Sequence, residues 1–306
     1  MKVAHLPGTH PYVDAIDPAA LRRRDDWNTD ELSAVGADLV HVHFGFEHLD
    51  RTRLANWIES VRARRIGLVH TVHDIDNPHL VDQRQHHERA ALLIESADIV
   101  TTLTHDAAAV IRQRWNRTPE VVAHPPLARV RPRVVKVDPR PLLWLGTLRP
   151  NIDRAIVRQI VDTPAASVDV VIRTQGWDAA GADLQTALLQ ASASNRIALS
   201  IIERPTDQQL ADLIGAAGAL ILPYGWGTHS GLVELATALG VPAVTTSSGC
   251  RGGQGAIVTS DERLLDVAHQ VGRSGHQVPP STSVVEARSA HRRLYSSLAG
   301  RAERPL

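Results

Sequence analysis

The chain has 306 residues, a length that suits one large domain or two ordinary ones. Its hydrophobic fraction of 43% and charged fraction of 22% are typical of a soluble globular protein, and its formal net charge is zero, so no strong field favours nucleic acid. The single cysteine, Cys250, excludes an intrachain disulfide, and no apolar run is long enough to predict a transmembrane helix. The first residues lack the apolar core of a signal peptide, and we expect a cytoplasmic protein.

Short apolar segments alternate with amphipathic ones along the whole chain. Strands are predicted over 2–6, 38–44, 66–73, 97–103, 120–123, 142–146, 167–174, 197–202, 219–222, 241–246 and 255–258. Helices are predicted over 50–65, 77–96, 105–115, 178–194, 205–217, 231–239, 261–272 and 284–299, with another from about residue 153. This alternation predicts an α/β protein whose parallel sheets are covered by helices.

One extended segment divides the chain. Residues 129–141 contain three prolines and five basic residues without helical periodicity, which indicates a connection between domains. We therefore predict two Rossmann-like domains facing a cleft, over 1–135 and 136–282. A C-terminal helix over 283–306 follows the second domain.

Histidines gather near strand ends in the first domain. His41 and His43 alternate on the strand over 38–44, so their side chains share one face of the sheet. An H-x-H pair at a strand end is also typical of zinc sites in amidohydrolase-type barrels, so a zinc hydrolase remains an alternative. His73 lies at the carboxyl end of another strand, where the functional groups of open α/β sheets collect.

The stretch over 219–249 predicts a phosphate site. A buried strand ends at Pro223, a loop with three glycines follows, and a helix begins near Thr228 or Ser230, both good N-cap residues. A helix N-terminus presents unpaired N–H groups and partial positive charge, and glycines let a ligand approach the backbone. Glu234 lies about one turn into this helix, where its carboxylate could accept two sugar hydroxyls beside a bound diphosphate.

The order of these parts resembles the donor-binding segment of GT-B glycosyltransferases, especially the retaining family that contains sucrose, trehalose and mannosyl transferases. The resemblance covers nearly the whole chain and is strong in three segments. These are 219–244, with its glycine-containing loop, Glu234 and the sequence ATALGVPAV over 236–244, the pattern D-L-V-H-V-H at 38–43, and the strand and loop over 142–149.

The resemblance implies a role for several residues. Glu234 matches the ribose-binding Glu of that family, and His73 matches a His that lies beside the reacting sugar; we predict both as catalytic. The donor diphosphate is expected on Arg149, Thr228, His229, Ser230 and Gly231. The acceptor is expected near Gly8, Thr9, His10 and His43.

Two departures from the family pattern affect this prediction. The family carries a second Glu eight residues before the one matched by Glu234, and Trp226 occupies that position. The usual G-R…K pattern after the first strand of the donor domain is also missing, since Thr147 replaces the Arg; Arg149 is the substitute anion binder.

The sequence therefore predicts a glycosyltransferase that moves a sugar from a nucleoside-diphosphate sugar to an acceptor. Related enzymes imply retention of anomeric configuration, with no metal and no cofactor. A nucleotide-sugar 2-epimerase or hydrolase of similar fold and a non-catalytic sugar-nucleotide binder remain alternatives. The basic helix over 50–65 could also make weak contact with an anionic membrane, although a solvated helix explains its charges as well.

Overall fold

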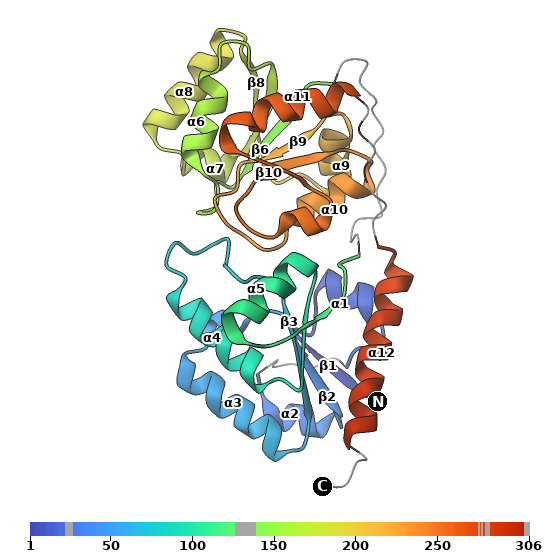
Figure 1. Cartoon of the computed structure of the whole chain (residues 1–306). Coiled ribbons are helices and arrows are strands. Elements are labelled where there is room, and N and C mark those ends of the chain that lie inside the picture. Colours follow the sequence, from blue (N-terminus) through green and yellow to red (C-terminus); the bar gives the residue numbers. More distant parts are fainter. Residues whose placement is uncertain (22–26, 126–138, 275, 277, 279–281, 303–306) are drawn as a thin grey trace. The chain divides into compact units, whose positions relative to one another are not determined.

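The computed structural model describes residues 1–21, 27–125, 139–274, 276, 278 and 282–302 (Figure 1). The chain divides into two compact units. Unit 1 comprises 1–76, 82–127 and 282–306, and unit 2 comprises 77–81 and 128–281. Most of the predicted connection over 129–141, and the predicted boundary at 135, lie outside the described residues.

Unit 1 is built on a parallel sheet whose strands keep their sequence order. Its strands are β1 (Val3–Leu6), β2 (Leu39–Val42), β3 (Gly67–Val72), β4 (Ile99–Thr102) and β5 (Glu120–Val121). Its helices are α1 (Pro11–Ile16), α2 (Thr29–Ala34), α3 (Arg51–Ala63), α4 (Arg84–Ser96), α5 (His105–Trp115) and α12 (Val284–Ala302), with a 3₁₀ turn η1 (Phe46–His48).

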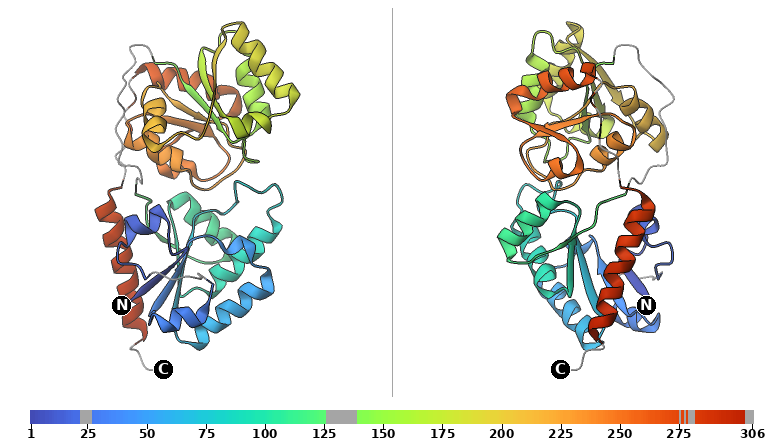
Figure 2. Two further views of the ribbon diagram at one scale, coloured as in Figure 1. Left: turned by 180° about the vertical axis from the view of Figure 1, so that it is seen from behind. Right: turned by 45° about the vertical axis from the view of Figure 1, so that its right-hand side comes forward.

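The strand order explains why the C-terminal helix belongs to unit 1. Right-handed crossovers between strands in sequential order place their helices on one face of a sheet, so the other face needs a separate cover. Helix α12, red in Figure 2, lies along the sheet of unit 1. Its Leu294 and Tyr295 supply the cover, because they pack with residues from four strands: Val3, Leu39, Val69 and Ile99. Tyr12 and Ile16 of α1 extend this cover by packing on Ala287 of α12.

The face beneath α12 changes character along the strands. Its amino-terminal part is apolar, whereas polar side chains follow toward the carboxyl ends. In register, His5 of β1 lies opposite His41 of β2, and Thr71 of β3 lies opposite Thr101 of β4. All four are buried, so this end of the sheet must satisfy its polar groups internally.

Unit 2 contains a second parallel sheet in the order β11-β10-β9-β6-β7-β8. Its strands are β6 (Leu142–Gly146), β7 (Val168–Arg173), β8 (Ile197–Ile202), β9 (Leu220–Leu222), β10 (Ala243–Thr246) and β11 (Ile257–Thr259). Its helices are α6 (Arg154–Asp162), α7 (Thr174–Asp178), α8 (Ala182–Ala193), α9 (Asp207–Gly215), α10 (Gly231–Ala238) and α11 (Leu264–Ser274), with 3₁₀ turns η2 (Arg251–Gln254) and η3 (Asp261–Arg263).

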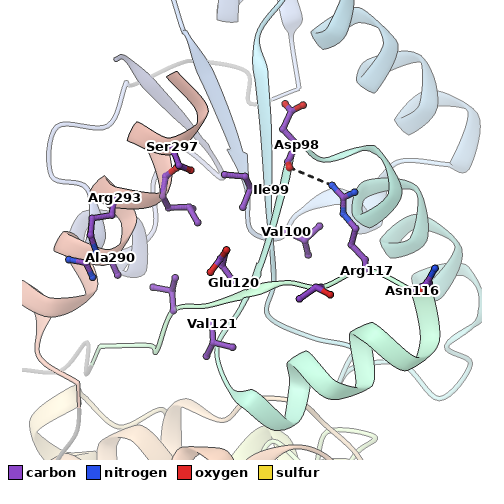
Figure 3. Close-up of a pocket in the computed structure, with 13 residues that line it drawn as sticks. Asp98, Ile99, Val100, Asn116, Arg117, Glu120, Val121, Ala290, Arg293 and Ser297 are labelled. Atoms are coloured by element: carbon purple, nitrogen blue, oxygen red, sulfur yellow. Dashed lines mark hydrogen bonds between the residues drawn. The ribbon is translucent and has the colours of Figure 1, made fainter. Parts of the chain in front are cut away.

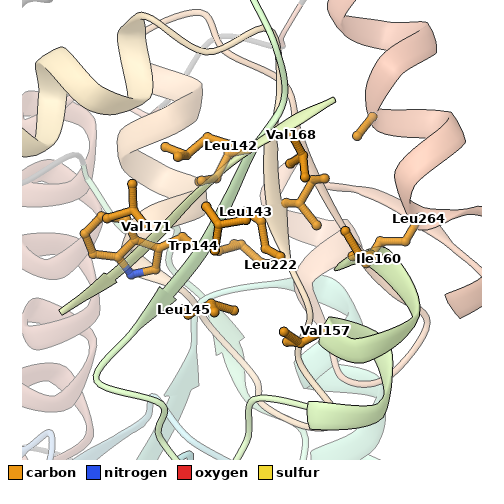
Figure 4. Packing of buried hydrophobic residues seen from close by; sticks show 14 of the residues in the cluster. Leu142, Leu143, Trp144, Leu145, Val157, Ile160, Val168, Val171, Leu222 and Leu264 are labelled. Carbon is orange, nitrogen blue, oxygen red and sulfur yellow. The ribbon is translucent and has the colours of Figure 1, made fainter. Parts of the chain in front are cut away.

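The core of unit 2 lies between its sheet and its helices (Figure 4). β6 is apolar on both faces, from Leu142 to Leu145, as a central parallel strand requires. Val157 and Ile160 of α6 and Leu264 of α11 pack against it from one side. The predicted fold class, α/β with two Rossmann-like domains, is thus confirmed. Among the described residues, no helix combines the length and apolar character needed to cross a bilayer.

Candidate functional site

The strand order of unit 2 places a topological switch point between β6 and β9. After β6 the chain continues to β7 and β8 on one side, and after β9 it continues to β10 and β11 on the other. The loops that leave these two neighbouring strands therefore diverge at the carboxyl edge of the sheet. In open α/β sheets this is where ligands bind.

Hydrogen bonds join the two diverging loops into one platform. The Asp153 N–H donates to the Pro223 carbonyl at 2.8 Å, and the Gly225 N–H donates to the Asn151 carbonyl at 2.8 Å. The Asn151 side-chain amide donates to the Trp226 carbonyl at 3.1 Å, while its Oδ1 is buried without a hydrogen-bond partner among the described residues. An unsatisfied buried acceptor at this edge suits a donor group on a ligand.

α10 begins on this platform. Its N-cap is Ser230, in extended conformation, and Ser230 makes no side-chain capping bond. No described residue accepts a hydrogen bond from the N–H of Gly231 or Leu232, and a Cβ placed on Gly231 would meet nothing within 4 Å. The helix start therefore offers N–H donors and open space together, which suits an anionic group. The predicted capping role of Thr228 is not observed, since Thr228 precedes the cap and is buried.

Glu234 is held one turn into α10 by two side chains. Its Oε1 accepts a hydrogen bond from Gln254 Nε2 at 2.9 Å and lies 3.3 Å from His229 Nε2. Gln254 is itself fixed by Ser230, whose N–H donates to Gln254 Oε1 at 3.0 Å. The structure thus brings together His229, Ser230, Gly231 and Glu234 of the predicted donor site. Sequence reasoning missed Gln254, which comes from a different loop.

A buried guanidinium supports the same loops. Arg251 is 1% exposed, donates to the Thr245 hydroxyl at 3.2 Å and to the Gly227 carbonyl at 3.1 Å, and lies 5.0 Å over the Tyr224 ring. Burial lowers the pKa of Arg251 to about 10, so the group stays charged at neutral pH. Sequence reasoning missed Arg251 as well; the run of glycines around it was the available signal. Arg149, the predicted anion binder, lies half-buried on the loop after β6.

The predicted residues of unit 1 lie at the carboxyl edge of its own sheet. His43 directly follows β2 and His73 directly follows β3, and His43 Nδ1 lies 3.3 Å from His73 Nε2. His10 caps α1 by accepting the Tyr12 N–H at Nδ1, 3.1 Å away, and its ring meets Phe44 edge-on. Gly8 is buried and Thr9 is exposed on the same loop. Desolvation lowers the pKa of His10.

The histidines that would hold a metal in a zinc hydrolase are His5, His41 and His43, whose ligand nitrogens lie within 4.8 Å of one another. Hydrogen bonds account for these nitrogens. His41 Nδ1 lies 2.8 Å from the Tyr295 hydroxyl and His41 Nε2 lies 2.6 Å from the Thr71 hydroxyl. His43 meets His5 at 2.9 Å. Burial and neighbouring histidines lower the pKa of both His41 and His43 well below the ordinary value. The geometry favours a cluster of rings hydrogen-bonded to one another and to hydroxyls over a set of metal ligands.

A separate pocket of unit 1 lies at the opposite edge of the sheet (Figure 3). It is lined by Asp98 and Val100 near the start of β4, by Arg117 before β5 and Glu120 at its first position, and by Arg293 of α12. These residues surround the amino ends of the strands, away from His43 and His73. A ligand in this pocket would therefore lie away from His43 and His73, whereas ligands of open α/β sheets bind at the carboxyl edge.

Comparison with known proteins bears on the fold. No protein-family model matches the sequence, and no curated protein sequence matches it. Several solved structures do. The Anabaena protein Alr3699/HepE, solved with UDP-glucose, has a TM-score of 0.61 at 13% identity over 88% of this chain and 82% of its own. The sucrose-phosphate synthase of Thermosynechococcus elongatus has a TM-score of 0.63 at 12% identity over 93% of this chain and 82% of its own.

A putative UDP-N-acetylglucosamine 2-epimerase from Listeria monocytogenes is also similar, with a TM-score of 0.57 at 16% identity over 89% of this chain and 77% of its own. These likenesses define the class: the chain has the GT-B fold, which glycosyltransferases and this epimerase share. At such identities they show the fold alone, so the reaction must be argued from the site.

Proposed function

We propose that the chain is a glycosyltransferase that takes a sugar from a nucleoside-diphosphate sugar and passes it to an acceptor. The observation that carries this proposal is the platform at the switch point of unit 2. There the start of α10, the buried Asn151 oxygen and the Glu234 carboxylate offer complementary groups for one ligand.

Each group suits a different part of the donor. The N–H groups of Gly231 and Leu232 suit diphosphate oxygens, and Arg149 adds a cation on the neighbouring loop. Glu234, held by Gln254, can accept hydrogen bonds from two ribose hydroxyls. Thr228, His229 and Ser230 line the same turn.

The reaction asks for charge stabilisation more than for covalent work by the protein. Negative charge builds on the leaving diphosphate, and preorganised N–H groups and guanidinium groups stabilise it. The buried charge of Arg251 lies beneath the Gly227 carbonyl and can stand in for part of the missing G-R…K pattern. On these grounds we propose a reaction without a metal. Retention of configuration is proposed from the family resemblance alone.

Unit 1 supplies the acceptor side in this proposal. His73 and His43 lie at the carboxyl edge of its sheet, next to the loop that carries Gly8, Thr9 and His10. A neutral His73 could hydrogen-bond an acceptor or sugar hydroxyl and hold it for attack. The membrane contact suggested for α3 stays a hypothesis. Arg62 of α3 donates to the Ser96 carbonyl, and Arg64, which follows α3, pairs with the Asp30 carboxylate.

A 2-epimerase or hydrolase is the second candidate, because a putative epimerase shares the fold and because Trp226 replaces the Glu expected near the transferred sugar. A non-catalytic binder is the third. Product analysis separates them: a transferase gives a glycosylated acceptor, an epimerase a new nucleotide sugar, a hydrolase free sugar, and a binder none of these.

The first test is a thermal-shift screen against UDP, GDP, ADP, TDP and their sugars. At about a hundred times its dissociation constant, a ligand adds roughly 2.7 kcal/mol of apparent stability. Glu234→Gln should abolish most of the shift, whereas Glu59→Gln, on the exposed side of α3, should preserve it. No shift with any nucleotide would sink the donor site.

A further inference from the structure

A chain of hydrogen-bonded rings runs from His73 to the edge of unit 1. We propose that His43, His5 and Asp17 form a proton relay that sets the tautomer of His73 and carries a proton from it to solvent. The part of this inference that concerns the reaction rests on the proposed function; the order of protons along the rings does not.

The distances define a continuous path. His73 Nε2 lies 3.3 Å from His43 Nδ1, and His43 Nε2 lies 2.9 Å from His5 Nδ1. His5 Nε2 lies 3.3 Å from Asp17 Oδ2. Each ring thus uses one nitrogen toward each neighbour. The path begins at the end of β3, crosses the end of β2 to β1, and leaves through the residue that follows α1.

The inner rings of the path lie away from solvent. His5 and His43 are at most 1% exposed, and burial lowers the pKa of His43 well below its ordinary value. Tyr12 closes the path from one side, because its ring lies edge-on to His43 at 5.2 Å and to His73 at 4.9 Å. A neutral imidazole has one N–H and one lone pair, so a row of them must point its protons in one direction.

Asp17 determines the direction in which the ring protons point. The hydrogen bond from His5 lowers the pKa of Asp17, and the Ala19 N–H donates to Asp17 Oδ1 at 3.1 Å, so the carboxylate is ionised and only accepts. His5 then carries its proton on Nε2 and accepts on Nδ1. His43 and His73 follow in the same order, each with its proton on Nε2. In this order Nδ1 of His73 carries the lone pair.

The acceptor hydroxyl gives its proton to His73 Nδ1 while its oxygen bonds to the sugar carbon, and the bond to the diphosphate breaks with its electron pair. The Nε2 proton of His73 moves to His43 Nδ1, that of His43 to His5 Nδ1, and that of His5 to Asp17. Asp17 has a side chain that is 21% exposed, so water can take the proton.

His41 provides an internal control. Its ring lies 4.0 Å from that of His43, and it is equally buried. Both of its nitrogens face hydroxyls, those of Tyr295 and Thr71, and neither faces the path. A change at His41 therefore disturbs the same core without interrupting the relay.

The test is the tautomer of each histidine, read from long-range ¹H–¹⁵N NMR spectra of the full-length protein. The relay predicts the Nε2–H form for His5, His43 and His73. Asp17→Asn, which replaces the acceptor-only group, should shift His73 toward the Nδ1–H form, and Asp17→Glu should restore Nε2–H. Asp162→Asn, an exposed matched change on α6, should shift nothing. A His73 tautomer that ignores Asp17→Asn would overturn the relay, as would stoichiometric bound zinc that His43→Gln releases.

Kinetics supply the second arm. Once a donor and acceptor are known, Asp17→Asn and His5→Gln should lower kcat about tenfold with little change in the donor KM, and they should alter the pH profile. His41→Gln should leave kcat within about twofold. Equal losses in all three variants would mean a structural role and overturn the relay. A wild-type protein without turnover would contradict the proposed function, while the tautomer measurement would still decide the relay.

Discussion

Gly249 lies against the carbonyl group of Gly227. A Cβ added at Gly249 would come within 1.9 Å of the Gly227 oxygen, and the backbone of Gly249 has a φ of +90°. The same Gly227 carbonyl accepts a hydrogen bond from buried Arg251 at 3.1 Å. The loop after β9, the loop after β10 and a buried cation therefore fit together only if residue 249 is glycine.

Gly249→Ala should consequently destabilise unit 2 and disturb the proposed donor site. We expect the positive φ to cost about 1 kcal/mol and the clash to add about 2 kcal/mol or more. Gly240→Ala is the matched control, because Gly240 has a φ of +71° with open space around it. This variant should therefore lose only the stability that the positive φ costs an alanine. Chemical denaturation measures both; equal losses would disprove the close contact.

The cover of the unit 1 sheet by α12 predicts a second result. Leu294 is 8% exposed in the cluster with Val3 and Tyr295, so Leu294→Ala should lower the free energy of unfolding by about 3 kcal/mol. Leu189→Ala removes the same atoms from an exposed site of α8 and should change it by less than about 0.5 kcal/mol. If the Leu294 variant were as stable as the Leu189 variant, α12 would not seal this face.

The buried histidines predict a loss of stability in mild acid. Burial lowers the pKa of His70 and of His291 to about 4, and burial with neighbouring histidines lowers the pKa of His41 and His43 well below the ordinary value. These histidines take up protons near pH 6.5 in the unfolded chain but stay unprotonated at that pH in the folded chain. The free energy of unfolding is therefore highest above about pH 6.5 and falls as the pH drops toward 4. Each of His70 and His291 should cost on the order of 2 kcal/mol at pH 5.

Unfolding free energies between pH 7.5 and 5 test this prediction. His291→Gln removes one titrating group and should flatten the decline, while His105→Gln, at the exposed start of α5, should leave it unchanged. The lowered pKa of Asp17 acts at more acidic pH and does not affect this window. A wild-type protein as stable at pH 5 as at pH 7.5 would contradict the neutral, buried cluster.

Hydrophobic periodicity and capping residues predicted most helices and strands, because these elements are determined by residues close together in the sequence. The helix over 50–65 is α3 (Arg51–Ala63), and Asp50 caps it by accepting the Arg53 N–H at 2.8 Å. The helix over 205–217 is α9, and Thr206 forms a full capping box with Gln209 before it. The alternation of strands and helices along the chain also predicted that the strands are parallel and that their carboxyl ends share one edge of each sheet.

Two predicted helices begin later than expected because turn chemistry outweighed periodicity at their starts. The helix predicted from residue 77 begins only at Arg84, since Asn77 turns the chain by accepting the His79 N–H at 2.9 Å. The helix predicted over 178–194 is α8 (Ala182–Ala193), which begins only after Gly181, whose φ is +79°; the short helix α7 (Thr174–Asp178) precedes it.

The sequence predicted only those residues of the candidate site that lie close together along the chain. His229, Ser230, Gly231 and Glu234 share one turn, so their proximity followed from the helix start. Gln254 and Arg251 reach the site from a later loop. His5 reaches His43 from 38 residues away along the chain, and Asp17 reaches His5 from 12 residues away. Such contacts depend on strand order, which periodicity does not specify.

The central claim is that a nucleoside-diphosphate sugar binds at the switch point of unit 2. Hydrogen exchange followed by mass spectrometry, with and without the nucleotide that gives the largest thermal shift, tests it most directly. The account predicts slower exchange of the amides over 147–153 and 225–235, lost in Glu234→Gln and kept in Glu59→Gln. Protection confined to other segments, such as those lining the pocket of unit 1 in Figure 3, or no nucleotide-dependent protection at all, would contradict it.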